Sequence, residues 1–102
     1  MDFRAIQVLC MAVRTLIDEM SWDAYGSPDI HTPIIRTDDD CHKLETLVDI
    51  MGTLTRMMDT RIAFATTEGK VIKEWVERIL ELGGRYLREL ETLQRLEKKA
   101  NL

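Results

Sequence analysis

The amino-acid sequence predicts an all-α protein: a three-helix antiparallel bundle with an overlong C-terminal helix, completed by homodimerisation. Apolar residues recur every three or four positions through most of the chain, which is the period of an α-helix. Leu, Glu, Arg and Met are abundant, whereas strand-forming residues are scattered. The last periodic segment, residues 67–99, would form a helical rod of about 48 Å. Because a compact chain of this length has a radius of gyration near ~13 Å, the rod extends beyond a monomeric core.

The first predicted helix covers residues 3–20, and we expect all 102 residues to form one domain. Its main apolar line consists of Phe3, Ile6, Cys10, Val13, Ile17 and Met20. A second line consists of Val8, Leu9, Ala12 and Leu16. Charges are few, so the helix is predicted to lie between other helices rather than on the surface. Two cysteines, Cys10 and Cys41, are too few for a disulfide framework and favour free thiols in a reducing compartment.

Residues 21–37 form the least helical segment, because prolines and a glycine punctuate it. It nevertheless carries large apolar side chains that disordered linkers lack. These side chains either close the open end of the bundle or contact another protein, and Trp and Tyr are common anchors of interfaces. The predicted partner-binding residues of this ordered loop are Trp22, Tyr25, Ile30, Ile34 and Ile35.

The second predicted helix covers residues 38–65. Thr37 is a favourable N-cap, and three aspartates follow it in the first turn, where the helix dipole favours anions. The apolar line of this helix consists of Leu44, Leu47, Met51, Leu54, Met58, Ile62 and Ala65.

The third predicted helix covers residues 67–99. Its apolar line consists of Ile72, Trp75, Ile79, Leu82, Tyr86, Leu90, Leu93, Leu96 and Ala100. Gly83 and Gly84 interrupt this pattern, but the apolar phase continues through them, which favours a continuous or kinked helix over a break. A close crossing with a second helix is an alternative reason for the glycines. The predicted dimerisation residues are Tyr86, Leu87, Leu90, Leu93 and Leu96.

No catalytic motif is present, so the sequence predicts a non-enzymatic protein with no catalytic residue, no metal and no cofactor. The alternative is a helical metal-dependent hydrolase or metal-binding protein that uses the acidic residues near the second helix. Its candidate ligands are Asp38, His42, Glu45 and Asp49. Consecutive residues of a helix point in different directions, however, and helix capping accounts for the three aspartates without a metal.

Charge and hydropathy indicate a cytoplasmic protein. The longest run without a charge covers residues 5–13, far below the ~20 residues of a membrane span. The net charge is −4, and residues 18–40 hold seven acids and one base. This balance argues against nucleic-acid binding, although a nucleic-acid-binding helical dimer remains an alternative.

The short, acidic, helical chain is similar in composition to small bacterial or phage-borne inhibitors, anti-activators and secretion chaperones. That similarity implies a protein that binds a protein partner and modulates it, most simply by inhibition. A secretion-type chaperone is the alternative that the same resemblance implies.

Overall fold

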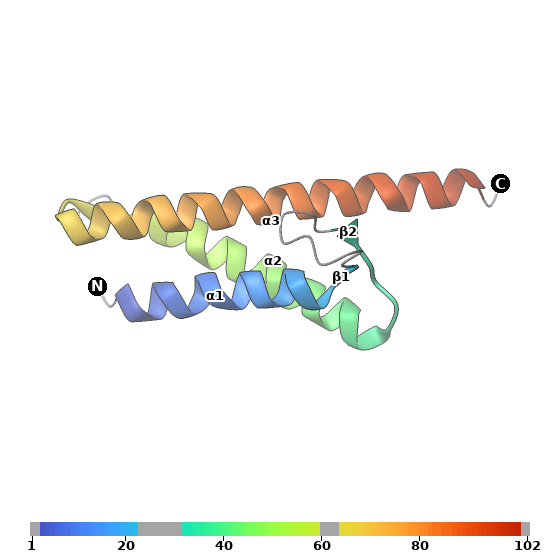
Figure 1. Ribbon diagram of the computed structural model, residues 1–102, viewed down its shortest axis with the longest axis horizontal. Helices are drawn as coiled ribbons and strands as arrows, with labels where there is room; N and C mark the ends of the chain where they lie inside the picture. Colours follow the sequence, from blue (N-terminus) through green and yellow to red (C-terminus); the bar gives the residue numbers. More distant parts are fainter. Residues whose placement is uncertain (1–2, 23–31, 60–63, 101–102) are drawn as a thin grey trace.

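The computed structural model describes residues 3–22, 32–59 and 64–100. Its elements in chain order are α1 (Phe3–Glu19), β1 (Ser21–Trp22), β2 (Thr32–Pro33), α2 (Asp38–Met58) and α3 (Thr67–Ala100). Successive helices run in opposite directions, so that α1 and α3 run in the same direction (Figure 1). All three helices contact one another. The predicted all-α bundle with a long C-terminal helix is therefore confirmed for one chain.

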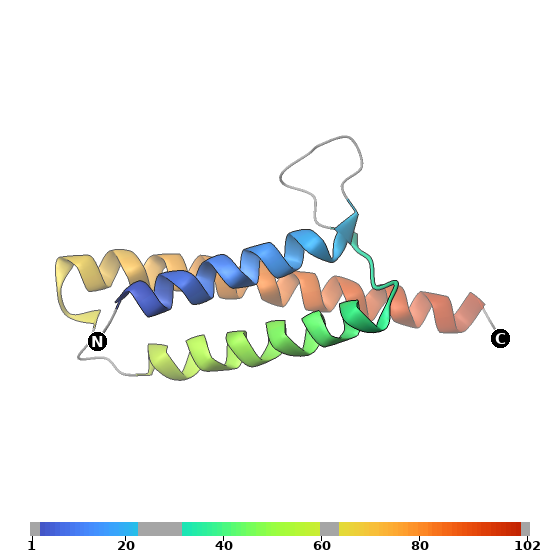
Figure 2. The same ribbon diagram turned by 90° about the horizontal axis from the view of Figure 1, so that it is seen from below.

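The hydrophobic core lies where the three helices face one another. Its buried members are Ile6, Cys10, Val13, Ile17, Met20, Leu47, Leu54, Phe64, Ile72, Val76, Ile79, Tyr86 and Leu90. Both ribbon views show that α3 continues past the ends of its neighbours (Figures 1 and 2). The molecule measures 53 × 27 × 21 Å and has a radius of gyration of 15.5 Å. It is therefore more extended than a compact chain of its length, for which ~13 Å is expected.

A two-stranded antiparallel ladder closes the segment after α1. Ser21 pairs with Pro33, and Trp22 pairs with Thr32. The N–H of Ile34 then donates a hydrogen bond of 2.8 Å to the carbonyl oxygen of Met20. The sequence did not predict this ladder, which returns the chain to the end of α1 before α2 begins.

Helix α2 begins as predicted and ends earlier than predicted. Thr37 is its N-cap, and its hydroxyl accepts a hydrogen bond of 3.1 Å from the N–H of Asp40. The predicted continuation to Ala65 is wrong, because the helix ends at Met58 and Ala65 is exposed and non-helical. Phe64 instead enters the core, with its ring centroid 6.4 Å from that of Phe3. This aromatic pair packs at the end of the bundle, where the prediction had placed the last turns of α2. Ile62, which the prediction placed on the apolar line of α2, lies outside the described residues.

Helix α3 continues through both glycines, as the apolar phase predicts. The two glycines differ in what surrounds them. A Cβ atom on Gly83 would lie 2.6 Å from the Sδ atom of Met51, whereas one on Gly84 would meet only the Nη1 atom of Arg88, at 3.5 Å. Gly83 therefore leaves room for the end of the Met51 side chain of α2, whereas a Cβ atom on Gly84 would make only an ordinary contact with Arg88.

Candidate protein-interaction surface

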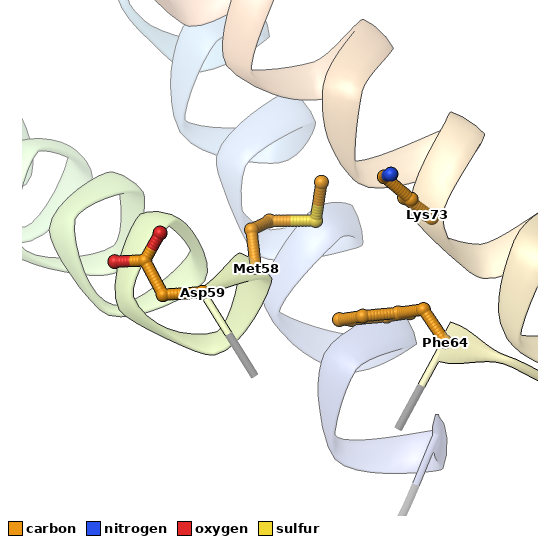
Figure 3. Close-up of a pocket in the computed structure, with 4 residues that line it drawn as sticks. All are labelled: Met58, Asp59, Phe64 and Lys73. Atoms are coloured by element: carbon orange, nitrogen blue, oxygen red, sulfur yellow. The ribbon is translucent and has the colours of Figure 1, made fainter. Parts of the chain in front are cut away.

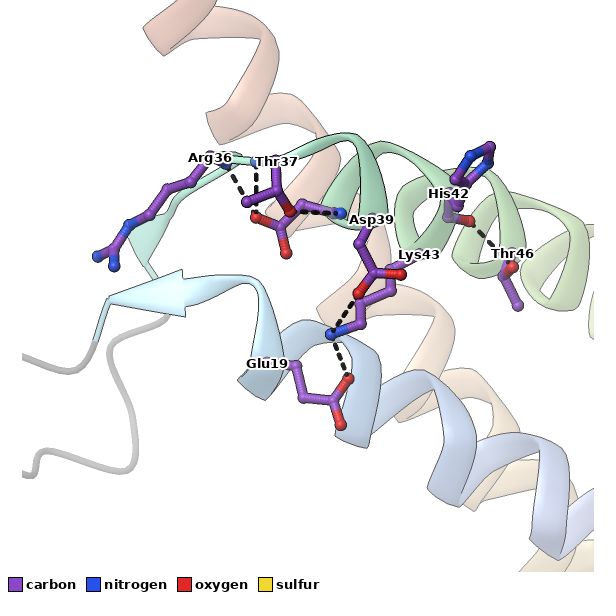
Figure 4. Close-up of polar contacts among 8 residues, drawn as sticks. Glu19, Arg36, Thr37, Asp39, His42, Lys43 and Thr46 are labelled. Carbon is purple, nitrogen blue, oxygen red and sulfur yellow. Dashed lines mark hydrogen bonds and ion pairs between the residues drawn. The ribbon is translucent and has the colours of Figure 1, made fainter.

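The acidic start of α2 is occupied by local contacts (Figure 4). The Oδ2 atom of Asp40 accepts hydrogen bonds from the N–H groups of Arg36, at 2.9 Å, and Thr37, at 3.2 Å. These hydrogen bonds, that of Arg36 first, lower the pKa of the Asp40 carboxyl. The Nζ atom of Lys43 lies 3.2 Å from Glu19 of α1 and 3.5 Å from Asp39. Capping and an ion pair between helices thus account for most of this acidic cluster.

The residues named for the metal alternative do not form a ligand set. Asp38, His42, Glu45 and Asp49 are all exposed on α2. The Nδ1 atom of His42 lies 4.0 Å from the Oε2 atom of Glu45, one turn along the same helix. Over residues 3–22, 32–59 and 64–100, no three His, Cys, Asp or Glu side chains are placed to hold one ion.

An open hollow of about 560 Å³ lies where α2 ends and α3 begins (Figure 3). Its lining includes Met58, Asp59, Phe64 and Lys73. The carboxylate of Asp59 and the ammonium of Lys73 give it one charge of each sign. Among these four described lining residues, no nucleophile is paired with a base. The buried Cys10 is also a poor nucleophile, because burial raises the pKa of its thiol.

The structure describes the predicted partner-binding loop only at its two ends. Tyr25 and Ile30 lie outside the described residues, and Trp22 is placed by its backbone pairing with Thr32. Ile34 and Ile35 are half-buried, and Ile35 packs against the core. The role of the loop as a binding surface therefore stays a prediction.

The predicted dimerisation residues divide into covered and exposed ones. Tyr86 and Leu90 are buried within the chain, and Leu87 is half-buried against the core. Leu93 and Leu96 are 37% and 58% exposed. Tyr86 and Leu90 are thus unavailable to a second chain, because α1 and α2 already cover this part of α3. The apolar surface that remains at this end of α3 consists mainly of two leucines.

A larger apolar surface lies at the other end of the molecule, across α1 and α3. We call it the apolar strip; it consists of Val8, Met11, Val71 and Trp75, which are 63%, 62%, 61% and 42% exposed. A hollow of about 100 Å³ between the helices is lined by Cys10, Met11, Arg14, Trp75 and Ile79. A second hollow, of about 320 Å³, is lined by Val71, Glu74, Trp75 and Arg78. The indole of Trp75 therefore borders both hollows.

The angular positions of residues around α1 could have predicted part of this strip, but the apolar lines drawn from the sequence did not. The prediction placed Trp75 on the buried line of α3, but the structure buries Val76 and leaves Trp75 exposed. It also placed α1 between other helices. At 100° per residue, however, Met11 lies ~100° around α1 from Cys10 and ~120° from Ile17, and Val8 lies ~160° and ~180° from these two buried residues. A helical projection centred on the buried line would have identified Val8 and Met11 as exposed.

Comparison with protein-family models gives no match, and comparisons with curated proteins and with solved structures give none either. None of the helices in the described part of the chain is long and apolar enough to cross a membrane.

Proposed function

We propose that this protein is a non-enzymatic helical protein that binds another protein and modulates it, by covering a surface that the partner needs. One observation supports the proposal above the others: the apolar strip. Seven large apolar side chains are exposed in the described parts of the chain, and six of them belong to α1 or α3. Single exposed apolar residues are common on proteins, whereas a group over two adjacent helices marks an interaction site.

The strip has the size and composition of a binding surface. Its four side chains expose on the order of 400 Å², within the range of the largest patches on monomeric proteins, which are often functional. Tryptophan is among the residues that dominate binding energy at interfaces. Methionine is flexible and adapts to the shape of a partner. Trp75 supplies a rigid anchor, therefore, and Met11 supplies an adaptable contact beside it.

Charged residues surround the strip and give it selectivity. Arg14 lies at the edge of the hollow between α1 and α3, and Glu74 and Arg78 flank Trp75 on α3. Charges at the rim of an interface change the association rate and the choice of partner more than the affinity. The loop residues Trp22, Tyr25, Ile30, Ile34 and Ile35 are proposed as a second contact.

The test begins with a pull-down from the native host, with the wild-type chain and a Val8→Ser/Met11→Ser variant as baits. Both positions are exposed, so the substitutions leave the core intact. The matched control is Val48→Ser, which makes the same kind of change at an exposed position of α2. A protein captured by wild type and control, but not by the double variant, is then purified for binding measurements.

With purified components, the double variant is expected to bind at least tenfold more weakly, which corresponds to about 1.4 kcal/mol. A partner that binds the double variant and wild type equally well contradicts the assignment of the strip. If a Trp22→Ala/Tyr25→Ala variant then loses at least ~2 kcal/mol of binding free energy, the contact lies in the loop instead.

A further inference from the structure

One side of α3 carries exposed residues along almost its whole length, and we call this side the outer face. It contains two rows in which residues recur every seven positions. One row consists of Trp75, Leu82, Glu89 and Leu96, and the other consists of Val71, Arg78, Arg85 and Thr92. All are exposed except Leu82, which is half-buried. Paired helices contact each other through two such rows of apolar residues, and four of these eight residues are apolar: Val71, Trp75, Leu82 and Leu96.

The distribution of residue types along the outer face is symmetric at its two ends, which are both apolar, but not at its centre, where Leu82 is equivalent to Arg85. Val71 and Trp75 lie towards one end, and Leu93 and Leu96 lie towards the other. The middle carries charge of both signs. This symmetry has a centre between Leu82 and Arg85, because Val71 and Leu96 lie equally many residues from that point. A helix face with such a centre is complementary to a second copy of itself that runs in the opposite direction.

We propose that a second copy of this chain packs antiparallel along the outer face of α3, with the two-fold axis between Leu82 and Arg85. In this register Val71 of one copy faces Leu96 of the other. Trp75 faces Thr92 and the adjacent Leu93 of the other copy. Each apolar end of α3 thus covers the opposite end of its partner.

Charge complementarity supports the same register. Arg78 and Glu89 lie equally far from the axis, so that each faces the other residue type in the second copy. The two-fold axis produces this ion pair twice. A parallel arrangement would instead place Arg78 against Arg78 and Glu89 against Glu89, and these like charges would repel. This ion pair therefore favours the antiparallel orientation, whereas Arg85 lies near Arg85 of the second copy in either orientation.

The hollow beside Trp75 fits the same register. It is lined by Val71, Glu74, Trp75 and Arg78, so it lies on the outer face at the position that Leu96 of the second copy would reach. An apolar side chain that fills a hollow beside an exposed indole makes a buried contact at the end of the interface. Leu96 is exposed in the isolated chain and gains this burial only in the dimer.

The size of the contact agrees with a dimer of moderate affinity. The stretch from Val71 to Leu96 is about 38 Å long as a helix, and pairing over that length buries on the order of 1,000 Å² in total. That area lies at the lower limit for a specific interface. Contact through Leu93 and Leu96 alone, nearer to the interface predicted from the sequence, would bury far less. Pairing along the whole outer face therefore reaches the minimum area of a specific interface, whereas pairing through the last turns of α3 does not.

This proposal goes beyond the binding of a partner protein and is tested with different substitutions. The two surfaces share Val71, Trp75 and the flanking Arg78, so a second copy and the partner protein compete for this part of the strip. Val8 and Met11 belong to α1 and lie beside the outer face rather than on it. The partner experiment changes those two residues, and the dimer experiment changes only charges on α3. Failure of one proposal can therefore be recognised without reference to the other.

The experiment uses charge reversal at the proposed ion pair. Wild type, Arg78→Glu and Glu89→Arg are examined by sedimentation equilibrium from about 1 to 200 µM, and so is an equimolar mixture of the two variants. Each variant alone brings like charges together twice, so its dissociation constant is expected to rise at least tenfold. In a heterodimer of the two variants both ion pairs form again, one with wild-type and one with reversed polarity, and the mixture is expected to recover wild-type association within about threefold.

The control is Arg88→Glu, which makes the same charge change on α3 away from the two rows, and it is expected to associate as wild type does. Circular dichroism verifies that every variant keeps its helices. A wild-type chain that remains monomeric at 200 µM overturns the proposal. So does a dimer that neither reversal weakens, or a mixture that associates no better than its components.

Discussion

The two parts of α3 have the same kind of sequence but different surroundings. From Thr67 to Leu90, the helix buries a residue at nearly every third or fourth position. From residue 91 to residue 100, every residue is exposed. The apolar line nevertheless continues through Leu93 and Leu96. Burial is therefore decided by the neighbours that a helix has, and not by its own pattern.

The difference follows from the lengths of the three helices. The 17 residues of α1 and the 21 residues of α2 form rods of about 26 and 32 Å, while the 34 residues of α3 form one of about 51 Å. Because α1 and α3 start at the same end of the bundle, the shorter helices leave the far end of α3 uncovered (Figure 1). Within the described parts of the chain, Leu93 and Leu96 at this end stay exposed.

The largest effect is expected from truncating Leu90, the last buried residue of α3, and it is compared with truncation of Leu96 in the uncovered part. Leu90→Ala removes a buried side chain and is expected to lower the free energy of unfolding by about 2–5 kcal/mol. Leu96→Ala removes an exposed one and should change it by less than ~0.5 kcal/mol. Urea titration at submicromolar protein concentration, where the proposed dimer is dissociated, measures both.

The same pair of variants has the opposite order of effects on self-association. At high protein concentration Leu96→Ala is expected to weaken the proposed dimer, because its side chain then loses the hollow beside Trp75. Equal destabilisation by Leu90→Ala and Leu96→Ala at submicromolar concentration would show that the far end of α3 is covered within one chain. That result would remove the distinction between the two parts of the helix.

A smaller effect is expected at the two glycines, which lie within the covered part of α3. Met51 is flexible enough to move away from a single methyl group, so a larger residue is needed for the test. Gly83→Leu is expected to lower the free energy of unfolding by about 1–3 kcal/mol, because it overpacks the crossing with α2. Gly84→Ala is expected to raise it by about 0.5–1 kcal/mol, because alanine favours the helix and meets no close atom. Thermal unfolding followed by circular dichroism measures both variants. A loss of stability in Gly84→Ala would contradict the predicted difference between the two glycines.

Much of the fold was predictable because it depends on local patterns. The apolar period identified three helices, and Thr37 with the following aspartates located the start of α2. The end of α2 at Met58 was not predictable, because Phe64 packs against Phe3, which lies far away in the sequence, and such a contact leaves no local signal. The β1–β2 ladder was missed for a similar reason, since two paired residues on each side leave no alternating pattern.

The interaction surface was less predictable than the fold. A sequence shows which residues are apolar, but which of them remain exposed depends on where the neighbouring helices lie. Trp75 illustrates this point: it fits the apolar line of α3 as well as Val76 does, and only the position of α1 leaves it at the surface. Tyr86 and Leu90 illustrate the converse, because the sequence assigned them to a dimer and the bundle itself buries them.

A further small loss of stability at neutral pH is expected at Tyr86, which lies near the end of the covered part of α3. Its buried hydroxyl donates a hydrogen bond of 2.6 Å to the carbonyl oxygen of Met20 at the end of α1. Tyr86→Phe is expected to lower the free energy of unfolding by about 1 kcal/mol. The loss stays small because the carbonyl oxygen still accepts the hydrogen bond from Ile34. Urea titration at pH 7 measures the difference.

The same tyrosine makes the stability of the bundle sensitive to alkaline pH. Burial, with a smaller contribution from the charge of Asp40, raises the pKa of Tyr86 to about 12 from 10.0. A raised pKa means that the folded chain favours the protonated phenol. The stability that this group contributes is therefore complete below pH 10 and is lost as the pH rises towards 12. The unfolding free energy of wild type should fall over this range relative to that of Tyr86→Phe. A constant difference between the two from pH 9 to pH 12 would show that Tyr86 is accessible to water, and that the covered part of α3 ends before it.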